Sequence, residues 1–154
     1  MTAFKSRIAR VCRPLNEAGA RYLLVGATAM QLWGTTRATQ DIDILIEPSI
    51  ENTKRVLAGL ATLGFGMAAE IDPAVVASRP VTMIGDLPNV DVLTRAWSLV
   101  WAQAHTRAHN FRVEGVTIPT ASIDDLIESK RTGRLQDAAD IEVLEAIKHF
   151  RRNG

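Results

Sequence analysis

Cysteine and histidine are scarce in this chain of 154 residues. The single cysteine, Cys12, excludes a disulfide within the chain, and its helical spacing from Ile8 and Leu15 is typical of a small buried residue. No zinc-ligand pattern is present, and no histidine accompanies a nucleophile motif. The sequence therefore excludes a disulfide scaffold and gives no support to zinc or histidine-nucleophile chemistry.

Long apolar runs are also missing, since no stretch approaches the roughly 20 apolar residues that a membrane span needs. The N-terminal segment alternates basic with apolar residues, unlike the continuous apolar core of a secretory signal. We therefore expect no membrane association and a cytoplasmic location. Hydrophobic residues still make up 47% of the chain, which is enough for a core, and no repeat or linker divides it. We expect one domain spanning residues 1–154.

The net charge of +1 hides an uneven distribution along the chain. Basic residues dominate residues 1–40, whereas carboxylates outnumber them in residues 41–100. The basic segment would favour an anionic partner such as RNA, and the alternative is the solvated face of an amphipathic helix. The basic residues of this segment are Lys5, Arg7, Arg10, Arg13, Arg21 and Arg37.

Hydrophobic periodicity, with glycine, proline and serine as punctuation, predicts a series of short strands and helices. Glu114 and Gly115 are placed to turn the chain within the last strand. The pattern indicates an α+β fold, a mixed β-sheet flanked by helices that ends in a C-terminal helical pair. The predicted strands are 22–25, 41–46, 81–84, 89–93 and 111–118, and the predicted helices are 3–18, 27–33, 50–63, 95–106, 123–131 and 136–150.

Asp41 and Asp43 lie two residues apart at the start of a predicted strand. Side chains two apart on a strand emerge on the same face, so the two carboxylates would be held close together. Such like charges repel each other and favour a bound cation, and hard oxygen ligands suit Mg²⁺. The alternative is a pair of ordinary surface aspartates at an exposed strand end, so the pair alone does not decide the matter.

The segment Val25–Gly34, followed by Arg37–Ile44, forms an apolar strand, a glycine turn, a helix and a strand of the form Asp-apolar-Asp-apolar. Residues 123–141 add Asp-Leu-Ile, a lysine and an Arg-x-x-Asp. Together these motifs resemble the nucleotidyltransferase superfamily typified by polymerase beta, particularly its small prokaryotic members found in toxin–antitoxin pairs. The resemblance implies a nucleotidyltransferase-like fold and a nucleoside triphosphate (NTP) as substrate.

In that family an acidic pair and a third carboxylate from a neighbouring strand bind two Mg²⁺ ions. The resemblance therefore implies catalytic and metal-binding roles for Asp41, Asp43 and Asp91. Paired metals stabilise the attacking and leaving oxygens of an in-line displacement, which is the chemistry that nucleotidyl transfer needs.

The resemblance also implies a set of nucleotide-binding residues. Gly26, Ala27 and Thr28 would hold the phosphates, because a turn before a helix presents free backbone N–H groups. Ala27 stands where the family turn has a second Gly or a Ser, and the Thr28 hydroxyl is the candidate to compensate. Lys130 would approach the triphosphate, with a solvated helix lysine as the alternative. Arg37 would reach a phosphate or a nucleic acid, with a surface arginine as the alternative.

We expect a Mg²⁺-dependent nucleotidyltransferase that moves a nucleoside monophosphate from an NTP to an acceptor hydroxyl. The acceptors found among relatives are RNA 3′ ends, protein hydroxyls and aminoglycoside-like drugs, and the basic N-terminal segment favours RNA such as tRNA. The resemblance suggests the toxin of a toxin–antitoxin pair, with an antitoxin protein as partner. Two alternatives remain, namely a metal-dependent RNase toxin and a non-catalytic binding module with a degenerate nucleotidyltransferase fold.

Overall fold

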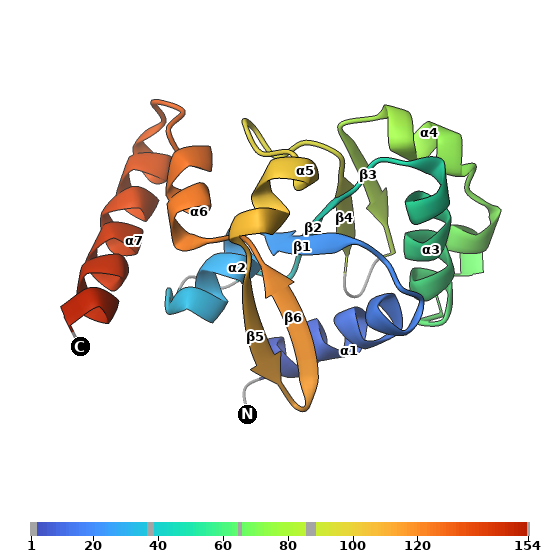
Figure 1. Cartoon of the computed structure of the whole chain (residues 1–154), viewed down its shortest axis with the longest axis horizontal. Coiled ribbons are helices and arrows are strands. Elements are labelled where there is room, and N and C mark those ends of the chain that lie inside the picture. Colours follow the sequence, from blue (N-terminus) through green and yellow to red (C-terminus); the bar gives the residue numbers. More distant parts are fainter. Residues whose placement is uncertain (1–2, 37–38, 65, 86–88, 154) are drawn as a thin grey trace.

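A six-stranded mixed β-sheet lies at the centre of the computed structural model, which describes residues 3–36, 39–64, 66–85 and 89–153 (Figure 1). The strand order is β3-β4-β2-β1-β6-β5. The pairs β1–β6 and β2–β4 are parallel, and the other three neighbouring pairs are antiparallel. The strands are β1 Tyr22–Val25, β2 Ile42–Ile46, β3 Val81–Ile84, β4 Val90–Leu93, β5 His109–Val113 and β6 Val116–Thr120.

Helices cover the sheet and extend beyond it at both ends of the long axis. Figure 1 shows α6 and α7 side by side at one end, and α3 and α4 at the other. Helix α1 packs against α3 and β6, and α2 contacts β2, α6 and α7. The α-helices are α1 Ala3–Glu17, α2 Gly26–Trp33, α3 Ile50–Ala61, α4 Pro73–Ser78, α5 Trp101–Ala104, α6 Ile123–Ser129 and α7 Leu135–Asn153. Within the described ranges, none of these helices is both long enough and apolar enough to cross a bilayer.

The hydrophobic core forms between the central strands and the helices on both faces of the sheet. Every residue of β1 is buried, as are Ile44–Ile46 of β2. Strands buried on both faces are apolar along their whole length, which matches the continuous runs in the sequence. On α1, Ile8, Val11 and Leu15 are fully buried and form its apolar face.

The predicted architecture, a mixed sheet flanked by helices with a C-terminal helical pair, is confirmed. Ser49 and Ser122 cap α3 and α6 by accepting hydrogen bonds from the backbone N–H groups of Asn52 and Asp125. The predicted turn at Glu114 and Gly115 divides the segment 111–118 into the hairpin β5–β6. Both turn residues have positive φ angles, of 51° and 78°.

The helix predicted over 95–106 is wrong in its first half. Ala96 and Leu99 are joined by two backbone hydrogen bonds across a tight turn, and α5 begins only at Trp101. Ala96 and Leu99 are both buried, so packing against the rest of the fold holds the turn in place. Helix α4 was not predicted, although Asp72 caps it and Pro73 occupies its first turn.

Candidate active site

The candidate site lies at one edge of the sheet, where β1 ends and β2 and β4 begin. Because β1 and β2 are antiparallel, Val25 at the end of β1 is paired with Asp43. Because β2 and β4 are parallel and in register, Asp43 is paired with Asp91. Strand pairing therefore brings together the glycine turn after Val25 and two of the three predicted aspartates, which are far apart in the sequence.

Asp43 and Asp91 present their carboxylates on the same face, because register partners in adjacent strands point the same way. Their neighbours Ile42, Val90 and Val92 face the opposite side and are buried. The two carboxyl groups hydrogen-bond to each other, which requires a proton on one of them. The sheet thus holds two like charges at a separation that only a proton or a cation relieves.

The arrangement changes the pKa of Asp43. Burial raises the pKa of Asp43 from the ordinary 3.8 to about 7, helped by the hydrogen bond with Asp91 and the negative charges of Asp91 and Asp41. The positive charge of Lys130 acts in the opposite direction and lowers this pKa. At neutral pH the negative charges at this edge are therefore only partly compensated, and Lys130 is near enough to stabilise the ionised form of Asp43.

Gly26, the first residue of α2, faces Asp43 directly. Its φ angle is +69°, a conformation that residues with a side chain rarely adopt. A Cβ at this position would collide with the Oδ2 atom of Asp43. Glycine is needed here for two reasons, the backbone conformation and the space taken by the carboxylate.

The first turn of α2 supplies backbone N–H groups next to the same edge. The N-cap residue Val25 makes no side-chain hydrogen bond to them, so among the described residues this first turn has no side-chain cap. The Thr28 hydroxyl donates instead to the backbone oxygen of Val25 at 3.4 Å, and the residue is buried. Among the predicted phosphate contacts, Gly26 and Ala27 open the helix, whereas the Thr28 side chain points back into the protein.

Asn89, which the sequence analysis did not single out, ties the acidic residues together. Its side-chain amide donates to Asp91 Oδ1 at 2.9 Å and to Asp41 Oδ1 at 3.4 Å, while its backbone oxygen accepts from Ile42 N at 2.9 Å. Asp41, which precedes β2, is exposed. The only sequence signal for Asn89 was its position two residues before Asp91, at the start of a predicted strand.

Lys130, at the end of α6, is buried and held by two acidic residues of α7. Its Nζ atom lies 3.2 Å from Asp140 Oδ2 and 3.5 Å from Asp137 Oδ1. Asp137 also accepts hydrogen bonds from Thr132 Oγ1 and from Arg134 Nε, and these contacts lower its pKa, the Thr132 hydroxyl contributing most. The Lys130 ammonium therefore has fixed neighbours, and it is not a freely solvated helix lysine.

The donor atoms at this edge are carboxylate oxygens, which suit a hard divalent cation. Asp43 and Asp91 are already adjacent, and the raised pKa of Asp43 marks a place where a cation would relieve repulsion. In the part of the chain that is described, however, no group of three or more His, Cys, Asp or Glu residues is arranged so that it could hold a metal ion. Asp41 bonds to Asn89 at the rim of the site instead.

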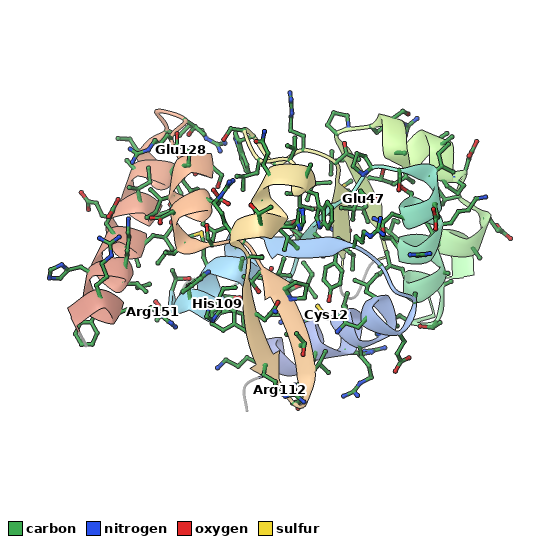
Figure 2. The ribbon with its side chains drawn as sticks, viewed as in Figure 1. Cys12, Glu47, His109, Arg112, Glu128 and Arg151 are labelled. Atoms are coloured by element: carbon green, nitrogen blue, oxygen red, sulfur yellow. The ribbon has the colours of Figure 1, made fainter. Side chains whose placement is uncertain are left out.

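The structure brings Gly26, Asp43, Asp91 and Lys130 together, with Asp41 at the rim. Arg37, predicted to contact the nucleotide, lies outside the described residues. The side-chain view in Figure 2 labels Glu128 on α6 and Arg151 on α7, and both of these helices contact α2.

Comparisons with known proteins bear on the fold. No protein-family model matches the sequence. No curated protein matches it either. Among solved structures, the chain is similar to the crystal structure of an antigenic nucleotidyltransferase-like protein from Paracoccidioides brasiliensis, with a TM-score of 0.63 and 14% sequence identity. The match covers 93% of this chain and 74% of that chain. The fold is therefore nucleotidyltransferase-like, as the motifs predicted.

Proposed function

We propose that the chain is a Mg²⁺-dependent nucleotidyltransferase that transfers a nucleoside monophosphate from an NTP to an acceptor hydroxyl. One observation carries the proposal. The carboxylates of Asp43 and Asp91 are adjacent, face the uncapped first turn of α2 at Gly26, and lie within electrostatic reach of Lys130. Sites for a metal and for phosphate thus share one edge of a nucleotidyltransferase-like fold.

In this proposal Asp41, Asp43 and Asp91 would hold two Mg²⁺ ions, which requires Asp41 to move inward from the rim, because the described carboxylates are not arranged to hold a metal ion as they stand. The ions would supply Lewis-acid stabilisation to the attacking and leaving oxygens. The backbone N–H groups of Gly26 and Ala27 receive the triphosphate, as free N–H groups at a helix N-terminus do for anions. Asn89 keeps the carboxylates of Asp41 and Asp91 oriented toward each other.

The chemical step joins the acceptor oxygen to the α-phosphorus and breaks the bond between that phosphorus and the bridging oxygen of the β-phosphate. The acceptor proton passes to Asp91, and pyrophosphate leaves with the electron pair of the broken bond. An ammonium group has three donors, and Asp137 and Asp140 account for two of them in Lys130. The third would point to the departing pyrophosphate, whose negative charge Lys130 would neutralise.

The acceptor is proposed to be RNA, such as a tRNA 3′ end, or a protein hydroxyl. RNA is proposed because the basic segment 1–40, which contains α1, would favour an anionic partner. Helix α1 lies toward the edge of the sheet opposite Gly26, because Ser6 bonds to Glu114 of the β5–β6 turn and Asn16 bonds to Thr117 and Tyr22. Any RNA contact with α1 would therefore be remote from the carboxylates. A toxin role with an antitoxin partner is proposed on the motif resemblance alone.

The test is to incubate the protein with each α-labelled NTP, Mg²⁺ and either total tRNA or cell extract. We expect label to join a macromolecule, and Asp43→Ala to abolish the transfer. Asp124→Asn is the matched control, since Asp124 is an exposed aspartate of α6 paired with Lys148. Shortened RNA would support the RNase alternative, and no Mg²⁺-dependent change of either kind would leave only the non-catalytic module.

A further inference from the structure

Trp97 differs from the other two tryptophans in its exposure. Its exposed fraction is 51%, whereas Trp33 is buried, and Trp101 is half-buried and stacks on His105. Trp97 stands at the tip of the tight turn between Ala96 and Leu99, which is closed by backbone hydrogen bonds of 3.0 and 2.9 Å. Since Ala96 and Leu99 are buried, the turn is anchored on both sides, and the indole projects from a fixed base.

The backbone of Trp97 has a φ angle of +55°, in the left-handed region. A bulky residue in this region is an outlier, and turns that need such a conformation ordinarily use Gly, Asn or Asp. Strained residues of this kind cluster at ligand-binding positions. An indole that is half exposed gains little from packing, so packing does not explain why tryptophan occupies a position that glycine would fill without strain.

The surroundings of Trp97 connect it to the candidate site. The Lys130 ammonium lies 5.9 Å from the centroid of the Trp97 ring, a cation–π distance. The same ammonium pairs with Asp137 and Asp140, and its charge acts on Asp43. Trp97 therefore contacts Lys130, the residue that would bind phosphate at the carboxylate edge.

We propose that the exposed indole face of Trp97 is a stacking platform for the nucleobase of the NTP whose phosphates bind at Gly26 and Lys130. This inference rests on the proposed function, because it takes an NTP as the ligand. A base stacked on an indole contributes dispersion and burial without hydrogen-bond readout. Since every base has a π-face, Trp97 strengthens the binding of all four nucleotides and selects weakly among them.

The test measures the binding of ATP, CTP and inorganic tripolyphosphate by calorimetry, in the presence of Mg²⁺, for the wild type and for four variants. Trp97→Ala should weaken the binding of ATP and CTP about 5- to 150-fold, the range measured for losing one base–aromatic stack. Trp97→Phe should retain most of the affinity. Tripolyphosphate has no base, so its affinity should be the same in all of these proteins.

Phe150→Ala is the matched control, because Phe150 is an exposed aromatic residue of α7 with an exposed fraction of 79%. It should bind ATP as the wild type does. A Trp97→Gly variant guards against loss of folding, since glycine accepts the turn conformation without strain. Trp97→Gly should unfold at no lower a temperature than Trp97→Ala and still show the weakened binding of ATP.

Two results would overturn the stacking role while leaving the proposed function in place. The first is unchanged affinity for ATP in Trp97→Ala and Trp97→Gly. The second is an equal loss for tripolyphosphate and for ATP, which would mean that the ring acts only through Lys130. If the wild type binds neither tripolyphosphate nor NTPs, the proposed function fails, and the stacking role fails with it.

Discussion

The carboxylate of Asp43 occupies the space that any side chain at position 26 would need. The relationship is specific, because other glycines of the chain with similar backbone conformations have open surroundings. Gly19 has a φ angle of +71°, nearly the same as the +69° of Gly26, and no atom lies within 4 Å of where its Cβ would be. A substitution at Gly19 therefore tests the effect of the positive φ angle alone, whereas one at Gly26 adds the steric clash with Asp43.

Gly26→Ala should destabilise the protein more than Gly19→Ala. Both variants lose about 1 kcal/mol for placing alanine at a positive φ angle. Gly26→Ala must also displace Asp43, which we expect to add about 1–3 kcal/mol and to abolish binding of Mg²⁺–NTP. Urea unfolding of both variants, with NTP binding measured alongside, checks this. Equal destabilisation by the two substitutions would show that the close approach of Asp43 has no energetic weight.

Asp43 should make the stability of the metal-free protein depend on pH. Its pKa is about 7 in the folded protein, against 3.8 for an ordinary aspartate. Between these values the folded state keeps a proton that the unfolded state has lost. Stability that is fully present below about pH 4 is therefore lost as the pH rises to about 7.

Asp43→Asn removes this titration, because asparagine carries no charge at any of these pH values. In EDTA near pH 8, the variant should be more stable than the wild type by about 1–3 kcal/mol, and the gain should vanish near pH 4. Urea unfolding across the pH range measures the difference. Asp124→Asn, at an exposed position, is the control and should leave the pH profile of the wild type in place. A gain that is independent of pH would contradict the raised pKa.

The sequence predicted the strands and the turn of this site because their signals are local. Apolar runs, the alternation from Asp41 to Ile46 and the glycine after Val25 each lie within a few residues of one another. The pairing of Asp43 with Asp91 depends on the parallel register of β2 and β4, and no local pattern contains it. The prediction that Asp91 belongs with the acidic pair came from the resemblance to a family, and the register agrees with it.

Two features of the site escaped sequence reasoning for physical reasons. Asn89 contacts Asp41, 48 residues away, so its role exists only once the strands are paired. The turn that carries Trp97 has none of the residues that usually mark a positive φ angle, and the tryptophans at 97 and 101 suit an amphipathic helix equally well. The backbone hydrogen bonds between Ala96 and Leu99 and the positive φ angle of Trp97 identify the turn, and both are properties of the folded chain.

Lys130→Met should destabilise the protein by about 3 kcal/mol. The substitution removes the cation that the buried carboxylates of Asp137 and Asp140 share, and reducing the compensation of a buried charge is costly, although Asp137 keeps its bond to Arg134. Adding Asp140→Asn to Lys130→Met should restore part of the loss, and a double-mutant cycle by urea unfolding measures how much. Additive losses would show that the ion pair has no coupling energy.

The same variant should also change the titration of Asp43. Lys130 lowers the pKa of Asp43, so its removal should raise that pKa further. In Lys130→Met, the loss of stability with pH should therefore extend to a higher pH than in the wild type. An unchanged profile would mean that Lys130 lies too far from the carboxylates to assist there.

Mg²⁺ should stabilise the protein only where the carboxylates are intact and ionised. A ligand that binds the folded state alone adds about 2.7 kcal/mol when its concentration is 100 times its Kd. Near pH 8 Asp43 has largely lost its proton and both carboxylates can take the cation, whereas near pH 5 the cation must compete with the proton on Asp43. We therefore expect the unfolding temperature to rise with MgCl₂ more steeply at the higher pH, in comparison with NaCl at matched ionic strength.

Asp43→Asn and Asp91→Asn should lose this response and Asp124→Asn should keep it. If all three variants responded as the wild type does, the Mg²⁺ would be bound elsewhere on the surface, and the carboxylate edge would not be its site.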